Sequence, residues 1–379
     1  LRKKVSFKNV EDRKAFIHKE LAPENSDKNK WLPDINGDGS HDWKDLTIEK
    51  ENVFKIQDTD GDGRADRSQL IASDFNQETS DVAGAVLYHD DALFVGVAPD
   101  LWRMTDTNGD GLMDEKKSLA HGFGVHIGFG GHNMSGLKVG PEGKIYWGIG
   151  DIGFSGKDNN GNLLDYPNCG VIARAKNNGY KVWMDEKMHL PRNEDQAAYF
   201  IPTIANYVNG PTGMQHNPGT GLGEQWKNKF FVAEFGGNAA RSGIHAFDLK
   251  PKGAGFEMGE TEQILTGILA TGMDFAPDGA LYFSDWIDGW VNKGYGRIWK
   301  FTDNTATSEI RKTTAAHLAK NYADLSKEEL ISLLAFEDQR VRQKAQFELA
   351  SRGDDGLEVF TSVLAQKENQ LARIHAIWG

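Results

Sequence analysis

Short apolar segments alternate with polar turns through the middle of the chain, and each segment ends at Gly, Asp, Asn or Pro. One phrase recurs, in which an apolar turn is followed by a Gly- or Asp-containing hairpin and a strand of aromatic and β-branched residues. It occupies residues 84–97, 136–151, 213–235 and 272–286. Recurring strand–turn–strand units of this kind predict a β-propeller, here over residues 51–305, with a β-sandwich as the alternative.

Two of these phrases contain a clear hairpin. Residues 145–149 and 281–284 are short and largely apolar, as expected for the inner strands of a propeller blade. Pro141-Glu142-Gly143 and Pro277-Asp278-Gly279 precede them as tight turns.

Beyond residue 313 the apolar positions recur with a period near 3.6, which is typical of helices. Ser326 and Glu329 form a capping-box pattern that opens the first helix. Further helices are predicted over 341–350, closed by Gly353, and around 357–364 and 371–377. Helix pairs of this length predict a HEAT-like repeat segment over 313–379, and a simple helical cap on the propeller is the alternative.

Composition narrows the class of protein. The 379 residues carry a formal net charge of −12, which disfavours nucleic acid and anionic membrane as partners. Cys169 is the only cysteine, so no disulfide can form within the chain, and no apolar stretch approaches the ~20 residues of a membrane span. Residues 1–50 are charged and irregular, and we interpret them as part of an incomplete first blade. The chain opens at Leu1 without a Met and stops within an expected helix, so we interpret it as a fragment of a longer precursor.

An acidic loop of nine residues occurs three times, at 34–42, 58–66 and 106–114. Calcium takes 6–8 oxygen ligands, and side-chain oxygens at loop positions 1, 3, 5 and 9 with a carbonyl at position 7 can surround one ion. The side-chain candidates are Asp34, Asn36, Asp38, Asp42, Asp58, Asp60, Asp62, Asp66, Asp106, Asn108, Asp110 and Asp114. We predict three structural calcium sites, and solvated hairpin turns are the alternative.

Position 12 of a full EF-hand carries a bidentate Glu, and the residue at this position differs among the three loops. Gln69 and Lys117 occupy this position in the second and third loops, so neither is a standard EF-hand. Asp45 occupies it in the first loop, which is therefore nearer to the EF-hand pattern. A fourth run over 157–166 is degenerate, because Tyr166 replaces the acid at position 9.

Residues 121–136 contain six glycines and three histidines, His121, His126 and His132. The segment leads directly into the strand at 145–149, which should place it on one rim of the propeller, where sites are usually built. Histidine can act as a base near neutral pH, and His132 is the candidate general base. Structural roles are the alternative for all three, and a joint transition-metal site is a further alternative.

Residues 131–151, GHNMSGLKVGPEGKIYWGIGD, resemble the catalytic blade of the soluble glucose and sorbosone dehydrogenases. Over residues 52–379 the chain more closely resembles the large membrane-bound-dehydrogenase family of planctomycetes and related bacteria. The resemblance is carried by DTDGDGRAD, PDLWRMTDTNGDG, HGFGVHIGFGGHNMSGL, NPGTGLG and DWIDGWVNKGYGRIWK. It implies an all-β six-bladed propeller followed by an α-helical HEAT-like segment, in an exported, periplasmic or cell-surface protein associated with a membrane.

The resemblance also implies an oxidoreductase that acts on a hydroxyl of a sugar or polyol. His132 would take the hydroxyl proton, and pyrroloquinoline quinone would accept the hydride. Lys293 and Arg297 would bind the carboxylates of the quinone, together with Asn209. Substrate-binding candidates are His126, Trp290 and Tyr207.

The chain departs from this pattern at one place. The soluble glucose enzymes carry an Arg-Asn-Pro-Gln-Gly-like run, and the corresponding stretch here is Asn209-Gly210-Pro211-Thr212-Gly213, without the Arg. A cytochrome domain or protein would accept the electrons, but no Cys-x-x-Cys-His is present, so a c-type haem would belong to a downstream domain. A calcium-propeller hydrolase or lyase, and a non-catalytic carbohydrate- or protein-binding propeller, are the other hypotheses.

Overall fold

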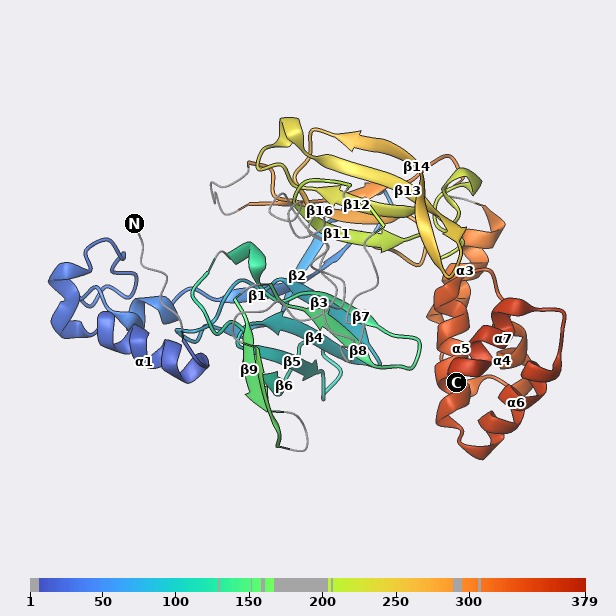
Figure 1. Ribbon diagram of the computed structural model, residues 1–379, viewed down its shortest axis with the longest axis horizontal. Coiled ribbons are helices and arrows are strands. Elements are labelled where there is room, and N and C mark those ends of the chain that lie inside the picture. Colours follow the sequence, from blue (N-terminus) through green and yellow to red (C-terminus); the bar gives the residue numbers. More distant parts are fainter. Residues whose placement is uncertain are drawn as a thin grey trace. The chain divides into compact units, whose positions relative to one another are not determined.

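The computed structural model shows a chain of two compact units (Figure 1). It describes residues 7–128, 130–150, 152–157, 161–166, 204–205, 207–288, 295–305 and 308–379. Unit 1 comprises Leu1–Gly140 and Lys144–Arg174, and unit 2 comprises Pro141–Gly143 and Ala175–Gly379. The division falls within 51–305, and the boundaries at 1–50, 51–305 and 313–379 stay predictions.

Unit 1 combines a short helical start with small antiparallel sheets. Its helices are α1 (Val10–Glu20) and the 3-10 turns η1 (Pro23–Lys28), η2 (Trp43–Thr47) and η3 (Gly130–His132). Its strands are β1 (Glu51–Gln57), β2 (Arg67–Phe75), β3 (Ala85–His89), β4 (Ala92–Val97), β5 (Asp100–Thr105), β6 (Glu115–His121), β7 (Ser135–Val139), β8 (Ile145–Gly148), β9 (Phe154–Lys157) and β10 (Leu163–Tyr166).

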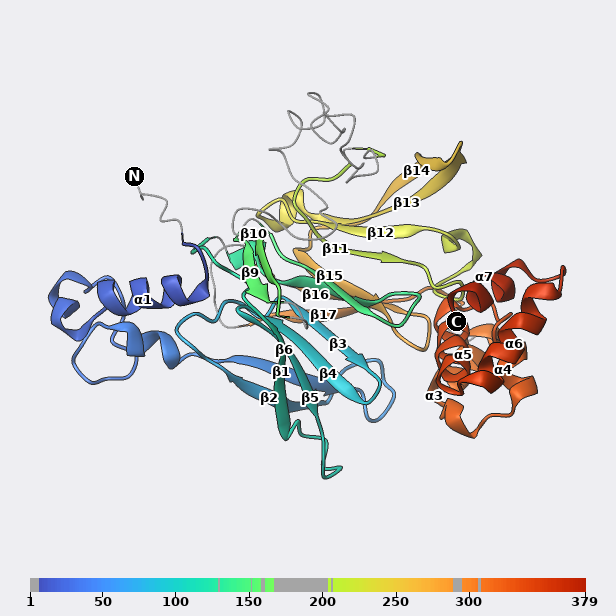
Figure 2. The same cartoon turned by 60° about the horizontal axis from the view of Figure 1, so that its bottom comes forward.

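The largest sheet of unit 1 has the order β3-β4-β5-β6, and Figure 2 shows these strands side by side. Strand β4 is buried along its whole length, as expected for an apolar inner strand. Its side chains enter two clusters of buried residues, one around Phe94, Leu101 and Met134 and the other around Val95 and Met104. These clusters fix the strands from whose ends the Asp-rich loops at 58–66 and 106–114 and the histidine–glycine segment emerge.

Helix α1 was not among the elements predicted from the sequence. Asn9 caps it by accepting a hydrogen bond from the Asp12 backbone N–H at 2.8 Å. Its inner face carries Arg13, which is buried and donates to the Gly124 carbonyl at 2.7 Å and to Asp81 at 3.2 Å. A charged residue on the buried face weakens the apolar pattern, so sequence periodicity could not reveal this helix.

Unit 2 begins with two antiparallel sheets, of orders β11-β12-β13-β14 and β15-β16-β17. The strands are β11 (Pro211–His216), β12 (Phe230–Glu234), β13 (Gly243–Lys252), β14 (Gly255–Thr266), β15 (Ala270–Phe275), β16 (Leu281–Asp285) and β17 (Arg297–Phe301), with 3-10 turns η5 (Glu224–Trp226) and η6 (Ala239–Arg241). Phe231, Ile244, Phe275 and Leu281 form the buried core that these sheets share.

The unit continues as a helical segment, drawn in orange to red in Figure 1. It comprises α3 (Glu309–Ala319), the 3-10 turn η7 (Tyr322–Asp324), α4 (Lys327–Leu333), α5 (Gln339–Ser351), α6 (Asp354–Ala365) and α7 (Gln370–Trp378). The capping box of Ser326 and Glu329 is present, which confirms the predicted start of α4. Gly353 lies where α5 gives way to α6, with φ +62°, a conformation that favours glycine.

The four repeated phrases all form antiparallel hairpins: β3–β4, β7–β8, β11–β12 and β15–β16. The described chain is therefore mostly β, in several small antiparallel sheets, with a helical segment at its C-terminal end. Closure of the sheets into a ring of six blades, and the HEAT-like character of the helices, stay predictions.

Candidate functional site

The three Asp-rich loops have one backbone fold, as their shared sequence predicts. In each, the carboxylate at position 1 accepts hydrogen bonds from the glycine N–H groups at positions 4 and 6. For Asp34, Asp58 and Asp106 these distances are 2.8 and 2.9, 2.7 and 2.9, and 2.7 and 2.8 Å. The side-chain oxygens at positions 3 and 5 accept from the N–H groups two residues later.

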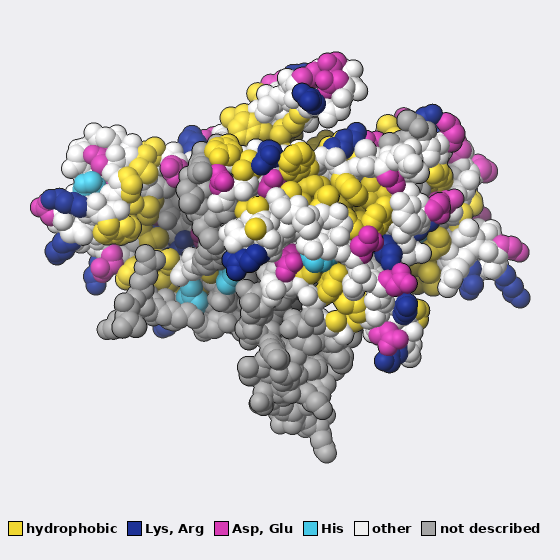
Figure 3. Space-filling model, turned by 90° about the horizontal axis from the view of Figure 1, so that it is seen from above, with side chains coloured by type: hydrophobic (Ala, Val, Ile, Leu, Met, Phe, Trp, Pro, Cys, Tyr) yellow, Lys and Arg dark blue, Asp and Glu magenta, His cyan; other side chains and the backbone are white. Residues whose placement is uncertain are grey.

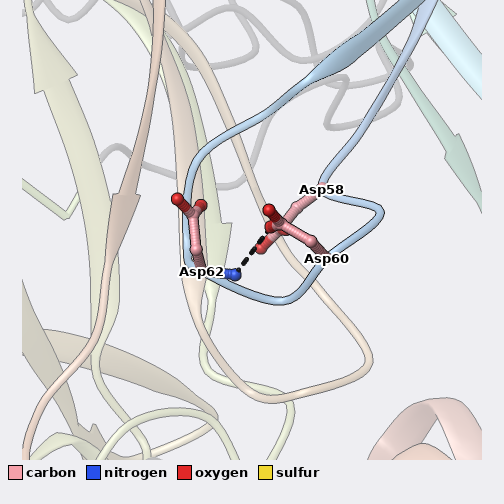
Figure 4. Close-up of side chains that lie close together, drawn as sticks. All are labelled: Asp58, Asp60 and Asp62. Atoms are coloured by element: carbon pink, nitrogen blue, oxygen red, sulfur yellow. Dashed lines mark hydrogen bonds between the residues drawn. The ribbon is translucent and has the colours of Figure 1, made fainter.

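Two of these loops bring their carboxylates together. Oxygens of Asp58, Asp60 and Asp62 lie within 4.8 Å of one another, at the tip of the β1–β2 hairpin (Figure 4). Oxygens of Asp106, Asp110 and Asp114 do the same at the tip of the β5–β6 hairpin. Like charges at this separation repel one another unless a cation lies between them. Both groups offer hard oxygen donors, the chemistry that Ca²⁺ prefers.

The acids at position 9 behave differently in these two loops. Asp66 accepts from the backbone N–H and the hydroxyl of Thr59, which lowers its pKa, and it does not belong to the converging group. Asp114 makes the same contacts with Thr107 and does converge. The pKa of Asp106 is lowered, mainly by the backbone N–H of Gly111 and also by that of Gly109, which favours its ionised form.

The loop at 34–42 has no such convergence of three acids among the residues that the structure describes. Asp45, at position 12, is buried and accepts from the N–H groups of Ile35, Asn36 and Asp42 at 2.8, 3.2 and 3.0 Å. Burial raises the pKa of Asp45, but these three donors outweigh it and the pKa is lowered. Asp45, in its ionised form, therefore holds the two ends of the loop together through these hydrogen bonds.

Two of the three histidines in the 121–136 segment make structural contacts. His121 lies 2.9 Å from Asp100 and 3.2 Å from Glu11, and the hydrogen bond with Asp100 is the main reason why its pKa is raised. His126 is buried, and its ring Nδ1 accepts from the Phe7 backbone N–H at 3.2 Å. A substrate-binding role for His126 stays a prediction.

His132 is half-buried at the end of η3, next to the end of β8. Its carbonyl accepts from the Gly150 N–H at 2.9 Å, and a Cβ at position 150 would lie 2.6 Å from that oxygen, so only glycine fits there.

The neighbour of His132, Asn133, was not singled out in the sequence. It is 5% exposed, and both its side-chain oxygen and its side-chain nitrogen are buried without a hydrogen-bond partner in the structure. A buried amide without partners is costly, which points to a water or ligand at this place.

Unit 2 gathers two of the predicted residues around Glu234. Asn209 donates to Glu234 through its backbone N–H at 3.1 Å and its side-chain amide at 3.3 Å. Tyr207 packs edge-on against His245, with ring centroids 5.7 Å apart, and burial raises the pKa of Tyr207. The His245 ring lies 2.9 Å from the second oxygen of Glu234. Sequence alone did not indicate His245, because this pairing joins neighbouring strands β12 and β13.

Of Lys293 and Arg297, the two basic residues predicted to bind the cofactor, the structure describes Arg297. Its guanidinium is half-exposed, lies 3.7 Å from Asp285, and stacks at 5.2 Å on the ring of Trp299. Lys293 and Trp290 lie outside the described residues, as does Cys169.

The molecular surface shows no concentration of one charge on the face that Figure 3 displays. Acidic and basic side chains are interspersed over the described residues there. Within the described part of the chain, no helix combines the length and apolar character needed to cross a membrane.

Comparison with known proteins gives a family match and several weak structural likenesses. Residues 11–187 match the model of a domain of unknown function, DUF7133. No curated protein matches the chain.

The chain is similar to the pyranose dehydrogenase PQQ domain from Coprinopsis cinerea, at 11% identity and TM-score 0.36, covering 64% of this chain and 91% of that one. It is also similar to a glucose dehydrogenase, at 14% identity and TM-score 0.30 over 67% and 74% of the two chains. A glucose-dehydrogenase-like oxidoreductase from Thermus thermophilus matches at 12% and 0.28, over 65% and 99%. Likenesses of this size carry no argument about activity, so the proposals below rest on the chain's own residues.

Proposed function

We propose that this chain is a calcium-binding β-domain in which the loops at 58–66 and 106–114 each hold one Ca²⁺. The observation that carries this proposal is the convergence of three carboxylates in each loop, on a backbone fold that both loops share. The ions would be structural, since each loop joins two strands of a hairpin: β1 to β2, and β5 to β6. Calcium would replace repulsion between carboxylates with attraction to a shared cation.

Thermal unfolding of chelator-stripped protein, with and without CaCl₂, tests this role. We expect calcium to raise the melting temperature, because an ion that binds only the folded state stabilises it. Asp60→Asn and Asp110→Asn should each reduce the shift, whereas Asp355→Asn, on the exposed side of α6, should leave it unchanged. Equal melting temperatures of the wild type in chelator and in excess calcium would rule the proposal out.

For the activity, we propose oxidation of a sugar or polyol hydroxyl with His132 as general base. Two observations support it: the His132 side chain is half-buried, so that solvent reaches it, and the orphaned Asn133 amide lies next to it in the chain. Pyrroloquinoline quinone would supply the two-electron acceptor. His132 would accept the hydroxyl proton as a carbonyl product forms.

Within unit 1, the Asn133 amide fits part of the quinone, because it has a free donor and a free acceptor of the kind that quinone and carboxylate oxygens need. Arg297 and Asn209 belong to unit 2, and cofactor binding by them stays a prediction from the sequence. The Arg297 guanidinium is half-exposed and suits a carboxylate, whereas the Asn209 amide already donates to Glu234.

The activity is tested by adding pyrroloquinoline quinone and CaCl₂ and following dye reduction by a panel of sugars. His132→Gln should abolish turnover but keep quinone binding, and His89→Gln, at the end of β3, is the matched control. Asn133→Leu should weaken quinone binding while raising the stability of the quinone-free protein by about 1–3 kcal/mol, because it removes two unpaired polar atoms. Turnover without quinone would favour a hydrolase or lyase, and saturable sugar binding without turnover a binding module.

We also propose that the small sheets are blades of a six-bladed propeller and that α3–α7 are HEAT-like repeats. The recurrence of the same hairpin at four places supports the first, and the packing of α4 to α7 around shared buried leucines and valines supports the second. Export to the periplasm or cell surface, and a cytochrome partner, remain hypotheses from the sequence.

A further inference from the structure

The first Asp-rich loop is closed by a different residue from the other two. In the second and third loops the acid at position 9 accepts from the N–H at position 2: Asp66 from Thr59 at 3.0 Å, and Asp114 from Thr107 at 3.0 Å. In the first loop that N–H belongs to Ile35, and it donates to Asp45 at position 12 instead. The acid at position 9 is thereby released from its usual contact.

The released acid is Asp42, which is completely buried. One of its oxygens accepts from the Lys44 backbone N–H at 2.8 Å, and the other, Oδ2, has no hydrogen-bond partner. The hydroxyl of Ser40, two residues earlier, is likewise buried without a partner. A buried carboxylate oxygen without a partner is strongly unfavourable, unless a cation binds it.

The Lys44 ammonium marks the place where such a cation would lie. It is 3.8 Å from Asp42 Oδ2 and 3.9 Å from Asp38 Oδ2, beyond hydrogen-bonding distance of both. One oxygen each of Asp38 and Asp42 therefore lies near the same half-exposed ammonium, which offsets part of their charge.

We propose that residues 34–45 form a third calcium site, in which Asp42 Oδ2 is a direct ligand and Asp45 is a positioning residue. Asp34, Asn36, Asp38 and the Ser40 carbonyl complete the oxygen set. Asp45 holds the loop through the Ile35 and Asn36 N–H groups and frees Asp42 to bind the ion. Calcium displaces the Lys44 ammonium, which lowers the affinity of this loop. The inference extends the proposed calcium-binding function but does not depend on the other two loops.

Calorimetric titration of the chelator-stripped full chain with CaCl₂ tests the site. Together with the two sites proposed above, we expect three ions per chain for the wild type and one fewer for Asp42→Asn, since Asn keeps the cap on Lys44 but loses the carboxylate charge. The matched control is Asp27→Asn, which removes the same charge from an exposed side chain of η1. Asp45→Asn separates ligand from positioning residue: it should weaken this site only several-fold, whereas loss of a direct ligand should abolish it.

Lys44→Met gives a readout that does not require any loss of structure. Removing a positive charge that competes with the divalent ion for the Asp38 and Asp42 carboxylates should tighten this site by about fivefold to tenfold at low salt. Lys30→Met, which removes an exposed lysine paired with Asp27, should not change it.

The outcomes separate this inference from the proposed function. If Asp42→Asn and Lys44→Met both titrate like the wild type, residues 34–45 hold no calcium, whatever the other loops do. If Asp60→Asn and Asp110→Asn have no effect but Asp42→Asn removes the single ion bound, the third site stands and the other two fall. Should Asp42→Asn fail to fold, as far-UV circular dichroism would show, the Lys44→Met affinity decides.

Discussion

Protonation of His375 should destabilise the helical segment at mildly acidic pH. His375, in α7, is 4% exposed, and its Nε2 accepts from the Arg342 Nε–H at 3.1 Å. Its Nδ1 lies 2.8 Å from the Gln346 side-chain oxygen, so the neutral ring donates there. Arg342 cannot move away easily, since it also donates to the Phe336 and Glu337 carbonyls at 2.6 Å each. An imidazolium would therefore face a fixed guanidinium in a buried place.

Burial, together with the Arg342 charge, lowers the pKa of His375 from 6.5 to about 4. The unfolded chain then binds this proton more readily than the folded one. The contribution of His375 to stability is complete above pH 6.5, falls as the pH drops, and stops changing below pH 4. The linkage gives a loss of about 2 kcal/mol between pH 7 and pH 5, and about 3 kcal/mol in total.

Urea unfolding followed by the helical circular dichroism signal at pH 7 and pH 5, at fixed calcium, measures this loss. His375→Gln keeps an acceptor for Arg342 but cannot be protonated, so it should lack about 2 kcal/mol of the pH dependence of the wild type. Carboxylate titrations are common to both proteins and cancel in the difference. If the wild type and His375→Gln lose the same unfolding free energy between pH 7 and pH 5, the His375 ring is not held uncharged in the folded protein.

Two further substitutions test packing and buried polar contacts. Gly356→Ala in α6 should destabilise the helical segment by about 1–3 kcal/mol in urea unfolding, although alanine favours helices, because its Cβ would lie 1.9 Å from the Leu349 carbonyl oxygen of α5; Thr361→Ala on an exposed turn is the control, and a stabilised Gly356→Ala protein would contradict the contact. Asp285→Asn should cost about 2–3 kcal/mol of unfolding free energy, because buried Asp285 accepts from the Leu269 and Ile287 N–H groups and the Trp299 indole at 3.0–3.1 Å, and an amide nitrogen would face donors; an unchanged urea midpoint would count against it.

Local patterns in the sequence were sufficient for the elements that local interactions decide. The hairpin turns, the Ser326 capping box and the common fold of the three Asp-rich loops follow from turn chemistry and hydrogen bonds between near neighbours. Each of these contacts spans few residues, so the residue types at fixed spacing determine it.

Contacts between distant residues could not be predicted in this way. The pairing of Glu234 with His245 depends on the register of β12 against β13, and the burial of Arg13 on its contacts with Asp81 and Gly124. The exchange of roles between Asp42 and Asp45 depends on which carboxylate reaches the Ile35 N–H. The orphaned Asn133 amide, likewise, is visible only once the surrounding core is in place.

Native mass spectrometry of chelator-stripped protein, after addition of CaCl₂, would count directly the metal ions that the Asp-rich loops retain. We expect discrete species that end at three calcium adducts, with one adduct lost for a substitution in each loop. A spectrum in which the protein gains no specific adduct, and in which magnesium and calcium give the same nonspecific tail, would contradict it.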